Sequence, residues 1–186
     1  MSDTPSIVRR IVAPPPPALI GLHLLVGPST IQSLVLFSLA RDLHAGRQVF
    51  WIDAGNWFDA YGLAKVSRAA QLDERRVLAN VHVARPFTAI QLNRMLAKQL
   101  PRVPSSCPVI VSDPMALFYD HEMPERDVSR IFREFIRVIR RLAVPVLGLA
   151  VTRTVPEARR ELSKRLLREV GTVARLRNTP EPLPLS

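Results

Sequence analysis

The sequence contains one cysteine, Cys107, among its 186 residues, and this limits the sites that it can build. A single thiol forms neither a disulfide within the chain nor a cysteine zinc cluster. The four histidines, His23, His44, His82 and His121, have no ligand-like spacing, so we expect no bound metal. So little cysteine favours a reducing, cytoplasmic location.

Long apolar runs are also missing. No stretch approaches the ~18 residues of a membrane span, and the apolar stretch 18–26 is interrupted by His23. The N-terminus carries Asp3 early and has no apolar core of a secretory signal, so we expect no membrane partner and no leader.

Acidic residues are few beside basic ones. The chain has 16 acidic and 26 basic residues, a formal net charge of +10, and its only lysines are Lys65, Lys98 and Lys164. Two interpretations stay open at this point. One is a basic protein with no special partner; the other is a polyanion-binding protein, since arginine forks fit phosphate geometry.

The chain length fits one domain with short tails. Residues 14–17 are all proline, so residues 1–18 are expected to form an extended arm. Residues 19–177 would form the domain, and residues 178–186 a proline-rich tail.

Apolar, strand-like runs alternate with segments of helical periodicity. The expected strands are 19–26, 48–53, 81–84, 109–112, 144–151 and 172–176. The expected helices are 31–45 (stopped by Gly46), 58–71, 73–78, 88–100 (capped by Thr88), 124–142 and 154–170, the last with a Thr154–Glu157 capping box. Strands that are apolar throughout and separated by helices predict an α/β fold with an open, doubly wound, mostly parallel sheet.

The first strand, turn and helix follow the order of a phosphate-binding loop but lack the residues that bind phosphate and magnesium. The working pattern is G-x-x-x-x-G-K-[ST], in which backbone amides, a lysine and a hydroxyl hold phosphates and magnesium. Alignment of its first glycine on Gly27 places Gln32 at the second glycine, Ser33 at the lysine and Leu34 at the hydroxyl. We therefore expect weak affinity, or none, for a nucleoside triphosphate and no cofactor.

Five segments in order, VGPS, VFWIDAGNWFD, NVHVARPFTAIQL, VIVSDPMALFYD and VPVLGLAVTRT, resemble the RecA-fold recombinase family. The likeness covers about 19–152 and is greatest to the archaeal and eukaryotic strand-exchange recombinases and their paralogues. It implies a RecA-like core of the P-loop type. It also implies that Gly55 stands where the family has its catalytic glutamate, and that Asp113 matches the aspartate that positions magnesium.

These departures predict a RecA-like pseudo-ATPase that is not an enzyme. Asp113 alone cannot hold a metal–triphosphate complex, and Asp53 and Asp113 are also expected as polar strand ends that cap nearby segments. Two other hypotheses remain. One is an enzyme with a rebuilt nucleotide site, in which arginine replaces the missing lysine; the other is a pseudo-ATPase subunit of an assembly unrelated to recombination, such as an RNA-binding or regulatory scaffold.

The helix expected over 124–142 carries the strongest binding signal. Its arginines recur every three or four residues and fall within an arc of roughly 100°. They are Arg126, Arg130, Arg133, Arg137, Arg140 and Arg141. The apolar residues of this helix fill the opposite face, so the row is expected to face outward, toward a phosphate backbone or an acidic protein surface.

A second basic cluster follows the next strand and includes Arg153, Arg159 and Arg160, interleaved with acids that favour ordinary ion pairs. A further set of aromatic residues lies near the end of the second strand. Trp51, Trp57, Phe58 and Tyr61 would stack a nucleobase or pack in the core.

Together these features predict a non-catalytic recombinase paralogue that assists DNA recombination or repair. Its partners would be DNA, a RecA-fold recombinase or a homologous subunit, with nucleoid association and oligomer formation left open.

Overall fold

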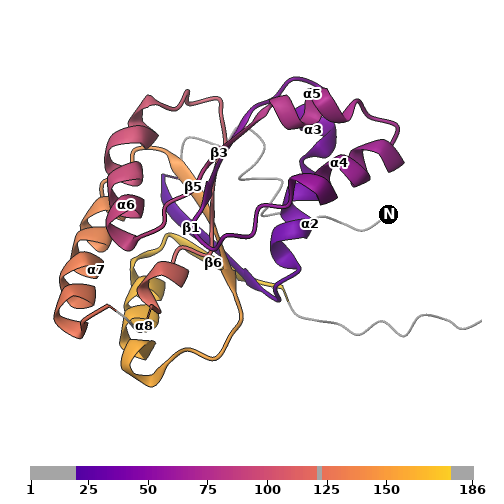
Figure 1. The fold of residues 1–186 in the computed structure, drawn as a ribbon. Helices are drawn as coiled ribbons and strands as arrows, with labels where there is room; N and C mark the ends of the chain where they lie inside the picture. Colours follow the sequence, from indigo (N-terminus) through magenta and orange to yellow (C-terminus); the bar gives the residue numbers. More distant parts are fainter. Residues whose placement is uncertain (1–19, 121–122, 177–186) are drawn as a thin grey trace, which may run out of the picture.

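The computed structural model describes residues 20–120 and 123–176. The proline-rich arm expected over residues 1–18 and the tail expected over 178–186 lie outside the described residues. The described part contains six strands and the helices that connect them (Figure 1).

The six strands form one sheet in the order β3-β2-β4-β5-β1-β6, and every pair of neighbours is parallel. The strands are β1 (Gly21–Gly27), β2 (Val49–Asp53), β3 (Val81–Ala84), β4 (Val109–Ser112), β5 (Pro145–Val151) and β6 (Thr172–Arg175). The expected α/β fold with a doubly wound parallel sheet is therefore confirmed.

Strand β1 lies near one edge of this sheet, between β5 and β6. It pairs with β5 along its whole length, from Gly21 opposite Pro145 to Gly27 opposite Val151. In the two common doubly wound orders the first strand lies beside the second. Here β4 and β5 separate β1 from β2, so the order differs from both.

Helices cover both faces of the sheet, as Figure 1 shows. One face carries α2 (Ile31–Ser38), α3 (Ala40–His44), α4 (Ala60–Ala69) and α5 (Glu74–Ala79). The other carries α6 (Ala89–Arg94), α7 (Glu125–Ile139) and α8 (Arg160–Glu169). Because parallel crossovers are right-handed, connections that run toward β3 and connections that run toward β6 place their helices on opposite faces.

Each face of the sheet has its own apolar core, since side chains alternate along every strand. Leu24 and Ile52 belong to the core under α6, α7 and α8. Leu25 and Trp51, their neighbours along the chain, belong to the core under α2 to α5. The first core contains the ring cluster of Phe118, Phe132 and Phe135.

Several local sequence signals act as expected. The hydroxyl of Thr88 accepts a hydrogen bond from the amide of Gln91 at 3.2 Å and so caps α6. Gly46 ends α3 with a left-handed φ of 94°, a conformation that glycine adopts without strain.

Three helices differ from expectation. The helix expected over 31–45 is divided at Leu39 into α2 and α3. The helix expected over 88–100 ends as α6 at Arg94 and continues as the π-helical turn η1 (Met95–Gln99) and the 3₁₀ turn η2 (Leu100–Arg102). Pro101 has no amide hydrogen to donate to an earlier carbonyl, so the α-helix cannot extend through it. The Thr154–Glu157 capping box is wrong, because α8 begins at Arg160 after the 3₁₀ turn η4 (Glu157–Arg159) and has no side-chain cap.

In open α/β sheets, ligands bind outside the carboxyl ends of the strands, where the chain direction reverses. Here β2 sends its helices toward β3, while the neighbouring β4 sends α7 toward β5. The reversal therefore falls between β2 and β4. Asp53 ends β2 at this edge and Asp113 directly follows β4.

Substitution Phe135→Ala tests the packing of α7. Phe135 has no exposed surface, and its ring centroid lies 5.2 Å from that of Phe118 and 6.0 Å from that of Phe132. We expect the variant to lose roughly 3–5 kcal/mol of unfolding free energy, because the ring leaves a cavity. Urea unfolding followed by circular dichroism measures this loss. Arg133→Ala on the exposed face of α7 is the control, and equal stability of the two variants would contradict the packing.

Candidate functional site

The turn that follows β1 is too short to surround a phosphate. Only residues 28–30 separate β1 from α2, and the amide of Ile31 donates to the carbonyl of Pro28 at 2.9 Å. Gln32, Ser33 and Leu34 therefore lie inside α2 and not in a loop. Gln32 is 2% exposed, whereas Leu34 is 57% exposed, so these side chains do not converge on one ligand position.

Ile31 also covers the end of β1. It is fully buried, and a Cβ built on Gly27 would lie 2.9 Å from the Cδ1 of Ile31. An isoleucine side chain thus packs over Gly27, the first glycine of the phosphate-loop alignment.

The carboxylate of Asp53 is fully buried and holds the carboxyl edge of the sheet together. Its Oδ1 accepts hydrogen bonds from the hydroxyl of Ser112 at 2.7 Å and the amide of Trp57 at 2.8 Å. Its Oδ2 accepts from the amide of Phe58 at 3.2 Å and from Arg85, at 3.1 Å from Nε and 2.9 Å from Nη2. Both oxygens have several donors, so Asp53 fixes the loop after β2. This is the strand-end capping that the sequence offered for it.

Arg85 is a site residue that sequence reasoning missed. It lies just after β3, in the NVHVARPF segment, where the family resemblance implies no role for an arginine. Its side chain is 40% exposed while its partner Asp53 is buried, so the ion pair joins the surface to the interior. The signal available in the sequence was an arginine that directly follows an expected strand.

Gly55 occupies a position with no room for a side chain. A Cβ there would lie 2.4 Å from Cδ1 of Trp57 and 2.8 Å from the Cβ of Asp113. The indole of Trp57 and the backbone-proximal part of Asp113 thus fill the space that a glutamate would need. The resemblance places the catalytic glutamate at this position.

Asp113 is buried and is ion-paired with Arg153, which follows β5. Its backbone is left-handed, with a φ of 43°, and its amide donates to the carbonyl of Leu149 at 2.7 Å. The guanidinium of Arg153 also lies 5.8 Å from the ring centre of Tyr119, and burial lowers the pKa of Arg153 from its usual value. Both groups are therefore engaged with each other at the ends of β4 and β5.

The arginine row on α7 faces outward, as expected. All six members, Arg126, Arg130, Arg133, Arg137, Arg140 and Arg141, are exposed. The buried residues of α7 are Val128, Ile131, Phe132, Phe135, Ile136 and Ile139. The helix thus presents one apolar face to the sheet and one basic face to solvent.

Two members of the row have acidic partners. Arg130 lies 3.6 Å from Asp127 one turn away. Arg140 makes a bidentate pair with Glu169 of α8, with both nitrogen–oxygen distances at 2.6 Å. The hydrogen bond from Arg140 holds the pKa of Glu169 below its usual value. Among the described residues no ion pair or hydrogen bond joins the side chains of the other four, Arg126, Arg133, Arg137 and Arg141, to a partner.

The second basic cluster serves mainly the fold. Arg159 is 8% exposed and donates to the carbonyls of Met123 at 3.1 Å and Asp120 at 3.5 Å. Its guanidinium is therefore used inside the molecule and is not available to a phosphate. Arg160 is exposed and lies 3.7 Å from Glu157. With Arg153 paired to Asp113, this cluster offers less free charge than α7 does.

The aromatic residues divide between core and surface. Trp51 is 1% exposed and meets Phe58 edge to face, with ring centroids 5.8 Å apart. Trp57 and Tyr61 are exposed, at 43% and 75%. Sequence reasoning missed Phe87 after β3, whose exposed fraction is 76%.

No protein-family model matches this sequence, and a search of curated proteins finds no significant match. Function must therefore be inferred from the residues of the chain. Within residues 20–120 and 123–176, no three His, Cys, Asp or Glu side chains are grouped so that they could hold a metal ion. No helix in those ranges has both the length and the apolar character that a membrane crossing requires.

Substitution Gly55→Glu tests whether the missing carboxylate can be restored. We expect a clear fall in thermal stability and no ATP hydrolysis, because the new side chain collides with Trp57 and Asp113. The double variant Gly55→Glu/Trp57→Ala should recover part of the stability, since removal of the indole relieves the closest contact. Thermal unfolding and phosphate release measure the two effects. A Gly55→Glu protein as stable as the wild type would contradict this account.

Proposed function

We propose that this chain is a non-catalytic, RecA-like recombinase paralogue that assists DNA recombination or repair by binding the DNA backbone through α7. The observation that carries the proposal is the exposed arginine row, in which Arg126, Arg133, Arg137 and Arg141 have no acidic partner among the described residues. A RecA-fold recombinase or a homologous subunit is the protein partner that the sequence resemblance suggests.

The row has dimensions that suit a polyphosphate. Arg126 and Arg137 of α7 are eleven positions apart, which corresponds to about 16 Å along the helix axis. Duplex DNA presents one phosphate charge per ~1.7 Å of its axis, so several phosphates lie within that length. Arginine also binds phosphate oxygens in a bidentate manner. Contacts of this kind give affinity and orientation without reading base sequence.

The absence of catalysis is supported by three features of the carboxyl edge. The turn after β1 is too short for a phosphate cradle, Gly55 has no space for a carboxylate, and Asp113 is paired with Arg153. The parallel sheet, in which β1 is separated from β2, agrees with a RecA-like core whose nucleotide chemistry has been lost.

Removal of three arginines from the row should weaken DNA binding. We expect Arg126→Ala/Arg130→Ala/Arg133→Ala to bind duplex and single-stranded DNA roughly tenfold or more weakly at low salt. The slope of log K against log salt should fall by about three, or about one per lost phosphate contact. Fluorescence anisotropy over a salt series measures both quantities.

The matched control removes the same number of positive charges from helices on the opposite face of the sheet. Arg41→Ala/Lys65→Ala/Arg75→Ala changes three exposed residues of α3, α4 and α5. This control should retain nearly wild-type affinity if α7 is the binding face. Equal losses in the two triple variants would mean that net charge alone is responsible and would contradict the proposal.

The same titration with single-stranded RNA addresses the alternative assignment. The alternative is a RecA-like pseudo-ATPase subunit of an assembly unrelated to recombination, which binds RNA or serves as a regulatory scaffold. The arginine row favours it as much as it favours DNA, because phosphate contacts are common to both nucleic acids. Tighter binding of RNA than of DNA at equal salt would select this alternative.

Magnesium–ATP should not stabilise the protein. A ligand at a hundred times its dissociation constant adds about 2.7 kcal/mol to the unfolding free energy, which raises the Tm by several degrees. We expect no such rise in a thermal-shift titration to millimolar ATP, with a DNA oligonucleotide as the positive control. A rise in Tm would instead favour an enzyme with a rebuilt nucleotide site.

A further inference from the structure

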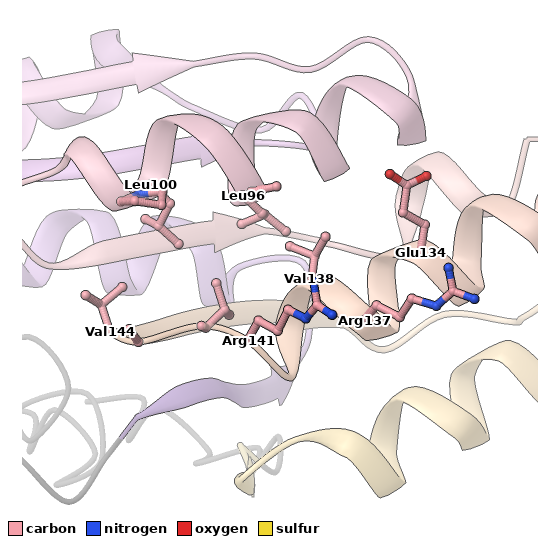
Figure 2. Close-up of a pocket in the computed structure, with 11 residues that line it drawn as sticks. Leu96, Leu100, Glu134, Arg137, Val138, Arg141 and Val144 are labelled. Atoms are coloured by element: carbon pink, nitrogen blue, oxygen red, sulfur yellow. The ribbon is translucent and has the colours of Figure 1, made fainter.

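A cavity lies beside the C-terminal half of α7, away from the carboxyl edge of the sheet. Its volume is about 470 Å³, within the range of ~300–1,000 Å³ that is usual for ligand pockets. One wall comes from η1 and η2, and the other comes from α7 and the segment that leads into β5 (Figure 2).

The walls of this cavity are apolar. Leu96 and Leu100 lie on the η1–η2 side, and Val138 and Val144 lie on the α7–β5 side, as Figure 2 shows. The leucine wall includes the π-helical turn Met95–Gln99. Such turns are rare and are frequently found at functional sites. The cavity therefore suits a large apolar group.

The rim is polar and comes from one stretch of the chain. Glu134 and Arg137 of α7, together with Arg141 in the turn that follows it, line the cavity beside the apolar residues (Figure 2). All three are exposed, and no ion pair or hydrogen bond joins their side chains to another described residue. The rim thus offers two guanidinium groups and one carboxylate to a ligand.

The segment that forms the opposite wall is basic, although its charged residues lie outside the lining of the cavity. The segment from Ala89 to Arg102 contains no acidic residue, and its basic residues Arg94, Lys98 and Arg102 are exposed. The basic surroundings of the cavity therefore favour an anionic ligand. Glu134 is the exception; it is exposed to solvent and can accept a hydrogen bond from a ligand that carries a donor.

We propose that this cavity binds an acidic peptide segment of a partner protein, with one large apolar side chain inserted between η1 and α7. Carboxylates of the peptide would pair with Arg137 and Arg141, and a peptide N–H would donate to Glu134. A fatty acid supplies the apolar chain and the carboxylate but has no donor for Glu134. A sugar–phosphate backbone supplies the charge but nothing that fills an apolar cavity.

This inference is independent of DNA binding, although the two surfaces share Arg137 and Arg141. Residues Arg126, Arg130 and Arg133 do not line the cavity. Ala97 lines it and carries no charge. Substitutions at these positions therefore separate the two activities.

The test uses two fluorescein-labelled peptides, Asp-Asp-Glu-Asp-Leu-Phe and Asp-Asp-Glu-Asp-Ser-Ser, and the full chain. The wild type should bind the Leu-Phe peptide at least about tenfold more tightly than the Ser-Ser peptide. Ala97→Trp, which fills the cavity from an exposed position, should abolish that preference and leave DNA binding unchanged. Ala69→Trp on α4, across the sheet, is the matched control and should behave as the wild type.

Charge reversal provides the second arm, which does not depend on Ala97. Arg141→Glu at the rim should weaken binding of the Leu-Phe peptide by about tenfold more than Arg126→Glu at the far end of α7. Circular dichroism of each variant verifies that it is folded. Equal affinity for the two peptides, no binding of either at 1 mM, or wild-type binding by Ala97→Trp would each overturn the proposal.

Discussion

A charged carboxylate without solvent contact is costly, and Asp53 places one at the carboxyl edge of the sheet. The fold satisfies this charge with donors from three parts of the chain: Ser112 at the end of β4, Arg85 after β3, and the loop after β2 itself. Three strand ends are thereby held in one arrangement. The loop after β2 and the end of β4 bring Trp57 and Asp113 against Gly55, so that no side chain fits at this position.

The second organising element is α7, whose two faces have separate roles. Its apolar face contributes Phe132 and Phe135 to the core, and its other face carries exposed arginines and fewer acidic residues. The fold does not require those arginines, since four of them have no partner among the described residues. Charge that is not used for stability is available for recognition. The cavity next to Val138 adds an apolar pocket to this row of charges.

The architecture follows from sequence because it depends on local patterns. Strands that are apolar throughout predict a sheet covered on both faces. In α7, the spacing of apolar residues and arginines by three or four positions identifies the outward side. Individual ion pairs cannot be predicted from local sequence patterns in this way. Asp53 and Arg85 are 32 residues apart, and their pairing depends on the register between β2 and β3. Arg159 and Arg160 are indistinguishable in sequence, yet one is buried on backbone carbonyls and the other is exposed. The cavity depends on a π-helical turn, which has no simple residue pattern.

Helices α7 and α8 are joined at both ends. Arg159, at the start of α8, donates to the carbonyl of Met123 just before α7, and Arg140, at the end of α7, is paired with Glu169 at the end of α8. These ties connect the two helices at both ends, while the buried apolar face of α7 determines which of its sides faces solvent. The guanidinium groups of α7 then keep a regular spacing. A ligand whose charges repeat at a similar spacing can bind them without deforming the protein, and it is favoured over a ligand that cannot.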